Sequence, residues 1–162
     1  MCQSATPTTP PAAHACSCQQ AGPHPGKRVP ATPEMILPEV PFPSLRVLEL
    51  AGEAGLRRLV AQHHALLRRS AIGALFAQDP EVFAQLVARV ADFVVEACGG
   101  GAAYTPAHGN TCMRTRHFPF TIDESAREVW LTLLWQAMQD SDFPPAAREE
   151  YWNWMEPFSL RM

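Results

Sequence analysis

Two arginines, one histidine and one proline lie within six residues of one another and could together hold an anion that contains a metal. They are Arg114, Arg116, His117 and Pro119. Because proline disfavours helical geometry in the residue before it, we expect a helix to break at Phe118 and to leave His117 rigidly placed. Its imidazole could offer one nitrogen to a metal while a backbone group fixes the other. The guanidinium groups suit carboxylates or phosphates. A flat, apolar, anionic cofactor with a central metal would use all these groups, and haem is such a molecule.

The surrounding residues, 93–122, carry a wider pattern of glycines, aromatic residues and histidines. Its members are Phe93, Gly99, Gly100, Tyr104, His108, Gly109, Arg114, Arg116, His117, Pro119 and Phe120. This pattern resembles the signature of truncated haemoglobins and is most similar to their group II branch. There, a phenylalanine ending the distal helix is followed by a Gly-Gly turn, a Tyr-x-x-x-His-Gly segment and Arg-x-Arg-His-x-Pro-Phe. The resemblance continues to Trp130 and covers residues 45–162.

The resemblance implies an all-α truncated globin fold, in which two antiparallel helix pairs cross as a two-over-two sandwich around haem b. It also implies that His117 is the proximal ligand of the haem iron. Without the surrounding motif, a lone histidine on an apolar segment is more often a hydrogen-bonded core residue.

The resemblance also assigns further residues to the cofactor. Those expected to contact haem are Phe76, Leu86, Arg89, Val90, Phe93, Tyr104, Met113, Arg116, Phe120 and Trp130. Arg116, Arg89 and Tyr104 are candidate partners of the haem propionates, and for the arginines the alternative is a solvated surface charge. Phe76 would wedge against the haem at a helix corner, a role compatible with ordinary core packing.

The distal ligand pocket is expected to contain His64, Leu86, Val90 and Trp130. Leu86 and Val90 cannot donate a hydrogen bond, whereas the Trp130 indole N–H can steady a negatively polarised ligand. The alternative for Trp130 is a buried core residue. The chain departs from the family at His63 and His64, where the family usually has Phe-Tyr and the tyrosine donates to bound dioxygen. His64 could donate to dioxygen, ligate the iron, give a proton for peroxide cleavage or merely pack against the surface, and the register is open by about one residue.

Helical signals account for the elements that would position these residues. Ser44 is expected to cap a short helix reaching Leu50, Gly52 to form a turn, and Asp79 with Pro80 to start another helix. Apolar spacing predicts three buried stripes. The first is formed by Leu56, Leu59, Val60, His63 and Leu67, and the second by Phe83, Leu86, Val87, Val90, Phe93 and Ala97. The third belongs to a helix capped by Asp123 and is formed by Ala126, Val129, Trp130, Leu133, Leu134, Ala137 and Met138.

Two further segments have different patterns. Residues 99–113 show no regular period, and the resemblance implies that this irregular segment lies along the cofactor. The last helix is expected to carry the aromatic cluster Tyr151, Trp152, Trp154, Met155 and Phe158, and Pro157 should kink it or end it early.

Length and composition indicate one domain, residues 45–162, preceded by an extension, residues 1–44. The extension is rich in proline and lacks apolar periodicity, so we expect it to be disordered. Its Cys2, His14, Cys16 and Cys18 admit a metal or redox role, although incidental thiols on a flexible tail fit the spacing better.

The net charge of -3 gives no electrostatic case for binding nucleic acid or an anionic membrane. No run of 18 apolar residues is present, and the first 20 residues lack the features of a secretory signal. We therefore expect a cytoplasmic protein with reduced cysteines.

The favoured function is a haem-binding globin that reversibly binds dioxygen or another diatomic ligand, as in oxygen transport, and acts as a monomer or homodimer. One alternative is a haem enzyme with nitric oxide dioxygenase or peroxidase-like activity. It would depend on a separate reductase, because the chain has no flavin or nicotinamide motif. The others are a haem-based redox or ligand sensor and a haem-free helical interaction module.

Overall fold

The computed structural model describes residues 24–26, 34 and 36–162, so Cys2, His14, Cys16, Cys18 and most of the predicted extension lie outside the described residues. The elements, in order, are α1 (Leu45–Arg68), η1 (Gly73–Leu75), α2 (Pro80–Ala97), α3 (Thr105–His108), α4 (Met113–His117), α5 (Glu124–Asp140) and α6 (Pro145–Ser159). The described part of the chain contains no strand, and the all-α prediction is confirmed.

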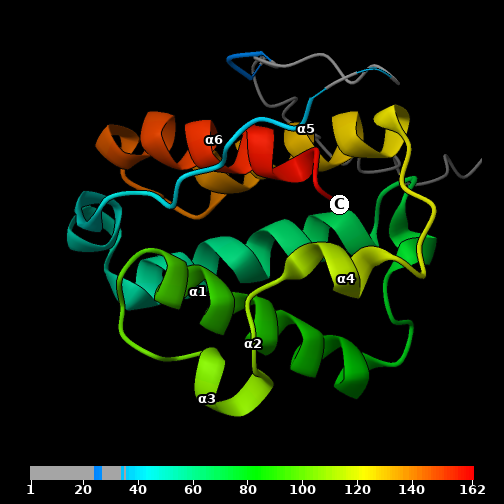
Figure 1. Ribbon diagram of the computed structural model, residues 1–162, viewed down its shortest axis with the longest axis horizontal. Helices are drawn as coiled ribbons and strands as arrows, with labels where there is room; N and C mark the ends of the chain where they lie inside the picture. The colour runs from blue at the N-terminus through cyan, green and yellow to red at the C-terminus, as the bar shows by residue number, and fades with distance from the viewer. Residues whose placement is uncertain (1–23, 27–33, 35) are drawn as a thin grey trace, which may run out of the picture.

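The four long helices form two layers. Figure 1 shows α5 and α6 together on one side and α1 with α2 on the other. The first helix packs against α2, α5 and α6, while α5 also packs against α6. The two short helices α3 and α4 lie in the connection from α2 to α5. This arrangement is the predicted two-over-two sandwich. None of the described helices combines the length and the apolar character needed to cross a lipid bilayer.

The first helix begins and bends where the sequence predicts. The Ser44 side chain accepts a hydrogen bond from the Arg46 N–H at 3.3 Å, and the helix starts at Leu45. Gly52 has φ 65° and ψ 162°, a conformation almost restricted to glycine, so α1 changes direction there. The predicted stripe after the bend is buried throughout: Leu56, Leu59, Val60, His63 and Leu67.

The second helix starts as predicted, but its buried face differs. The Asp79 carboxylate accepts hydrogen bonds from the N–H groups of Glu81 and Val82 at 2.9 and 3.0 Å, and Pro80 is the first helical residue. Within the predicted stripe, only Phe93 is buried, and the other five residues are half-buried. The buried residues of α2 are Ala91, Phe93, Val94 and Val95. The helix therefore leaves part of its apolar face accessible.

The buried stripe of α5 is rotated relative to the predicted one. Arg127 and Leu131 are buried although neither belongs to the predicted stripe, whereas Val129 and Leu133 are half-buried. Leu134, Ala137 and Met138 are buried as expected. Arg127, a charged residue, can lie on the buried face because it is paired with Glu124 of its own helix and Glu156 of α6.

Two other predictions are corrected in part. The segment predicted to be irregular contains the short helix α3, whose start is held by α2: the Glu96 carboxylate accepts hydrogen bonds from the N–H groups of Tyr104 and Thr105 at 2.7 and 2.9 Å. Pro157 does not end the last helix, which continues for two more residues to Ser159, while the alternative of a kink stays a prediction.

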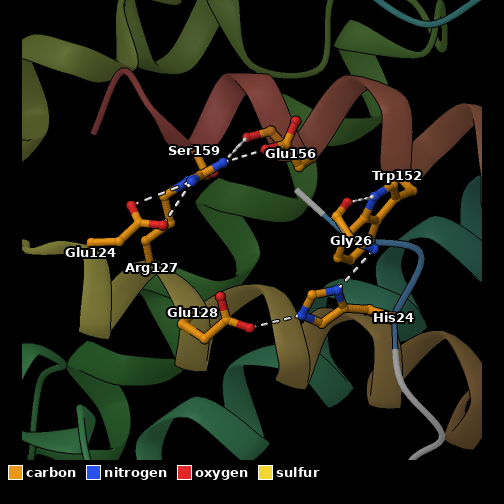
Figure 2. A network of polar contacts seen from close by, with 8 residues as sticks. All are labelled: His24, Gly26, Glu124, Arg127, Glu128, Trp152, Glu156 and Ser159. Atoms are coloured by element: carbon orange, nitrogen blue, oxygen red, sulfur yellow. Dashed lines mark hydrogen bonds and ion pairs between the residues drawn. The ribbon is translucent and has the colours of Figure 1, made fainter. Parts of the chain in front are cut away.

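A buried ion pair joins α5 to α6. Figure 2 shows the Arg127 guanidinium between Glu124 of its own helix and Glu156 and Ser159 of α6. Arg127 donates to the Glu156 carboxylate, to Ser159 Oγ at 2.8 Å and to Glu124 Oε1 at 3.1 Å. Arg127 is 4% exposed and Glu156 is 0% exposed, so this pair lies within the core.

A short segment before the helices, residues 24–26, is bound across the same two helices, and we refer to it as the clasp. His24 Nε2 hydrogen-bonds Glu128 Oε1 of α5 at 2.9 Å, and its ring stacks on Trp152 of α6 with centroids 5.0 Å apart. The Trp152 indole N–H donates to the Gly26 carbonyl at 3.3 Å, and the Gly26 N–H donates to His24 Nδ1 at 3.1 Å. These contacts connect α5 with α6 through a segment distant in sequence (Figure 2).

Candidate functional site

His117 is the last residue of α4, and its ring is oriented by that helix. Its Nδ1–H donates to the Met113 carbonyl at 2.8 Å, because a carbonyl oxygen can only accept. In the neutral imidazole, Nε2 then carries the free lone pair, and it has no hydrogen-bond partner among the described residues. The side chain is half-buried. A metal-ligating histidine typically shows this arrangement, with one nitrogen fixed by a backbone group and the other available.

His64, on α1, has the same ring orientation in a more buried setting. Its Nδ1–H donates to the Val60 carbonyl at 2.8 Å, and the side chain is 7% exposed. Burial lowers the pKa of His64, so the ring is neutral near pH 7 and Nε2 is an acceptor or a ligand. In this tautomer His64 cannot donate a hydrogen bond from Nε2. The Phe76 ring meets it edge-on, with centroids 6.0 Å apart.

His63 has the opposite orientation and contacts Trp130 of α5. Its Nε2–H donates to the Trp130 carbonyl at 3.0 Å, and the two rings meet edge-on with centroids 4.7 Å apart. Burial, followed by the neighbouring His64, holds the pKa of His63 well below its usual range. His63 is not among the residues predicted to form the distal pocket, but the register left open by about one residue made it a second candidate beside His64 as an internal iron ligand.

His63, His64 and Trp130 line a small cavity of about 30 Å³, which is large enough for one small molecule. His117 is not among the residues that line this cavity. Its polar lining comes from His63, His64, Trp130 and Tyr151, and its apolar lining from Leu59, Val60, Val90, Val94, Leu134 and Met155. Three members of the predicted distal pocket, His64, Val90 and Trp130, are thus brought together. The fourth, Leu86, is half-buried on α2 and does not line this cavity.

Tyr104 is a candidate for contact with an anionic group. It is 1% exposed, and its hydroxyl is buried without a hydrogen-bond partner among the described residues. The Arg116 guanidinium lies over the Tyr104 ring at 5.6 Å and donates to the His108 carbonyl at 2.7 Å. A buried hydroxyl without a partner is costly, and a carboxylate brought to it would satisfy that donor. Arg89 is exposed on α2.

The remaining predicted contact residues vary in exposure. Phe93 is buried and packs with Tyr104, Trp154 and Phe158, whereas Phe76 and Met113 are half-buried. Phe120 is 46% exposed, and the neighbouring Phe118 is 68% exposed. The exposed aromatic side chains next to His117 and the half-buried residues of α2 are apolar surfaces of the kind that a flat cofactor such as haem covers.

Comparisons with known proteins show the family to which the chain belongs. The bacterial-like globin family matches residues 49–162 of the chain. Hell's gate globin IV, in a phosphate-bound crystal structure, is 48% identical and has a TM-score of 0.77, with 85% of this chain and 86% of that chain covered. The group II truncated hemoglobin from Bacillus anthracis is 25% identical with a TM-score of 0.64, covering 71% of this chain and 92% of that chain.

A curated relative matches over a shorter stretch. The group 2 truncated hemoglobin YjbI of Bacillus subtilis is 33% identical over 57 residues, which is 35% of this chain. The matched segment spans 43% of that protein's length.

Proposed function

Since the chain belongs to the bacterial-like globin family and is a truncated haemoglobin, a globin that binds haem, we propose that it reversibly binds dioxygen or another diatomic ligand at a haem iron held by His117. The supporting observation is the orientation of His117, whose Nδ1–H is held by the Met113 carbonyl while Nε2 is free. When bound, haem supplies an iron with one coordination position left for an external ligand.

The propionate groups of haem are best matched by Tyr104 and Arg116. The buried Tyr104 hydroxyl lacks a partner among the described residues, and the Arg116 guanidinium lies over the ring of the same tyrosine. Phe76, Leu86, Val90, Met113 and Phe120 offer apolar surface, none of it fully buried in the protein. A carboxylate at Tyr104 would pair that hydroxyl, and a flat apolar ring would cover the partly exposed side chains.

On the distal side, Trp130 is the proposed hydrogen-bond donor. The residue lines the cavity, and within the described residues its only side-chain or backbone contact with another helix that involves a hydrogen bond is the carbonyl bond to His63. His64 has the complementary role, because its Nε2 presents a lone pair. His64 is therefore an acceptor of a proton or an internal iron ligand.

A second candidate function is peroxidase-like turnover, and the His64 tautomer favours it. Peroxide cleavage would need a group that takes a proton from one oxygen of hydrogen peroxide and returns it to the other, which leaves as water. A buried neutral imidazole with a free Nε2 meets that requirement. The electrons would come from an external reductant. Reversible binding remains the first proposal, because it requires no further component.

Absorption spectroscopy tests the first proposal directly. We expect the purified protein to show a Soret band that shifts on reduction and shifts again under carbon monoxide. We expect His117→Gly to lose most of the haem and added imidazole to restore it, because imidazole can occupy the place of the missing side chain. His24→Ala, which removes another histidine, should retain haem. Wild-type protein that shows no Soret band after addition of haemin would refute the assignment.

The variant His64→Leu separates the two functions. If His64 acts as the base for peroxide, peroxidase turnover should fall about 100-fold or more in this variant, in line with the loss of a general base, while haem content stays normal. Unchanged turnover would exclude His64 as that base. A change from a six-coordinate to a five-coordinate spectrum in the same variant would identify His64 as an internal ligand.

A further inference from the structure

We infer that His63 is a positioning residue, which aims the distal indole of Trp130 by holding both its backbone and one flank of its ring. The inference rests on the proposed function, since Trp130 affects a ligand only when haem is bound. It concerns a residue whose usual counterpart in the family, phenylalanine, cannot form the same hydrogen bond.

The two contacts of His63 reach the same residue from different directions. The Nε2–H donates to the Trp130 carbonyl at 3.0 Å, across 67 residues of sequence. The imidazole also lies edge-on to the indole, with centroids 4.7 Å apart and planes at 71°. The hydrogen bond fixes the backbone from which the indole projects, and the ring contact limits rotation of the indole about its side-chain bonds. Together they restrict both the position and the direction of Trp130.

The hydrogen bond is protected from competing water. His63 is 3% exposed, and it lies on α1, the helix that packs against α2, α5 and α6. The Trp130 carbonyl is inside α5 and has a second lone pair, so it can accept from His63 without losing its helical hydrogen bond. The buried hydrogen bond between α1 and α5 therefore fixes the position of the Trp130 backbone from which the indole projects.

The polar atom of Trp130 is not used for this anchoring. Its Nε1 has no hydrogen-bond partner among the described residues, and its ring lines the cavity together with those of His63 and His64. The indole is thus held through its backbone and its flank, and no hydrogen bond within the described residues occupies its N–H. If His63 served only as core filling, a phenylalanine at this place would do equally well.

Two variants separate the roles of the hydrogen bond and the ring. His63→Phe keeps a planar ring against Trp130 but removes the donor, and His63→Gln keeps a donor but removes the ring. We expect the dissociation rate of dioxygen or carbon monoxide to change about five- to tenfold in His63→Phe, the size expected when one hydrogen bond is misdirected. We expect the infrared C–O stretch of the carbon monoxide complex to shift as well, with partial recovery of both in His63→Gln.

A double-mutant cycle with Trp130→Phe shows whether His63 acts through the indole. If it does, His63→Phe should change neither the rate nor the C–O stretch once the indole has been removed. An equal change in both backgrounds, or no change in the wild-type background, would overturn the inference. A normal Soret band with such results leaves the proposed function intact, whereas a wild-type protein without a Soret band rejects the function itself.

A nuclear magnetic resonance measurement gives a readout independent of ligand rates. The indole N–H resonance of Trp130 is assigned by its absence in Trp130→Phe, using the diamagnetic carbon monoxide complex. We expect it to shift or broaden in His63→Phe, while those of Trp135, Trp152 and Trp154 stay in place. An unmoved Trp130 resonance would contradict the positioning role, and movement of all four would show that the substitution disturbs the core in general.

Discussion

The ring nitrogens of the three histidines at the site are set by the helices that carry them. His64 and His117 each donate Nδ1–H to the carbonyl four residues earlier, so both present Nε2. His63 uses Nε2 instead, because its acceptor belongs to another helix. Adjacent residues on one helix point in different directions, and so His63 and His64 have different chemical roles although they share the same side chain.

Burial of His63 and His64 makes the stability of the haem-free protein depend on pH. Burial lowers the pKa of both groups in the folded state, His63 the more strongly. Below about pH 6.5 the unfolded chain therefore binds protons that the folded chain does not bind, and the free energy of unfolding falls as the pH falls. We expect urea unfolding to show a loss of about 1–2 kcal/mol between pH 6.5 and 5.5 and little change above pH 7.

The variant His63→Phe is the control for this dependence. Removing the histidine with the more strongly lowered pKa should reduce the loss between pH 6.5 and 5.5 by at least about half. The carboxylates with lowered pKa, Glu96 and Glu150, titrate below their usual range and contribute only at lower pH. A pH dependence that is the same in the variant would assign the effect to other groups.

Part of the site could be predicted from local sequence, and part could not. The place of His117 follows from the motif around it and from Pro119, both of which are local. The contact of His63 with Trp130 depends on a backbone carbonyl 67 residues away, which no short pattern specifies. Arg127 is similar, since its burial depends on Glu156 in another helix. Side chains whose partners lie on distant elements escape reasoning from sequence alone.

At the scale of elements, α1 owes its bend to one glycine. Gly52 has φ 65° and ψ 162° while the residues on either side are helical, and a Cβ added there would meet no other atom within 4 Å. Glycine is therefore required at position 52 by the backbone conformation and not by lack of space for a side chain. By contrast, Gly55 lies within the straight part of α1, where a Cβ would meet the Ala51 Cβ at 3.4 Å.

These two glycines form a matched pair for mutation. We expect Gly52→Ala to lower the free energy of unfolding by about 1–3 kcal/mol, because alanine is strained in that conformation. We expect Gly55→Ala to be neutral or to stabilise by up to about 1 kcal/mol, because alanine loses less backbone entropy in a helix. Chemical denaturation of the haem-free proteins measures both. Equal effects at the two positions would argue against the bend at Gly52.

Helix starts were predicted well because their signals are local. Ser44, Asp79 and Asp123 all cap the helices that follow them, through hydrogen bonds to nearby N–H groups. The buried faces were predicted less well. On α2 the apolar positions Leu86 and Val90 are only half-buried, and periodicity cannot distinguish a residue that meets a cofactor from one that meets protein. On α5 the buried face includes the charged Arg127, so apolar spacing does not identify that face.

At the scale of the whole molecule, the Arg127–Glu156 pair holds α5 against α6 from inside. We expect Glu156→Ala to lower the free energy of unfolding by about 3 kcal/mol, because it removes the main buried partner of a buried guanidinium. Replacing both residues by apolar ones, as in Arg127→Met with Glu156→Leu, should cost much less than Glu156→Ala alone. Thermal and urea unfolding provide the comparison, and Glu149→Ala, an exposed position on α6, is the control. A double variant as unstable as Glu156→Ala would show that the ion pair itself stabilises the fold.

The two-over-two arrangement as a whole was predictable through the resemblance, because the motif spans the α2–α5 connection that such folds share. The contacts made by the clasp, which precedes the helices, could not be predicted from the sequence. The clasp joins Glu128 and Trp152 through His24 and Gly26, and none of these residues belongs to a recognisable motif.

The clasp can form only late during synthesis of the chain on the ribosome. A chain is synthesised from its N-terminus, so Gly26 leaves the ribosome long before Trp152, which follows 126 residues later. At about 5–20 residues per second, the interval between them is about 6–25 seconds. During that time His24 has no Trp152 to stack on, and for most of it no Glu128 to bind. The clasp therefore closes only after α6 has emerged, which makes it one of the last contacts to form on a newly made chain.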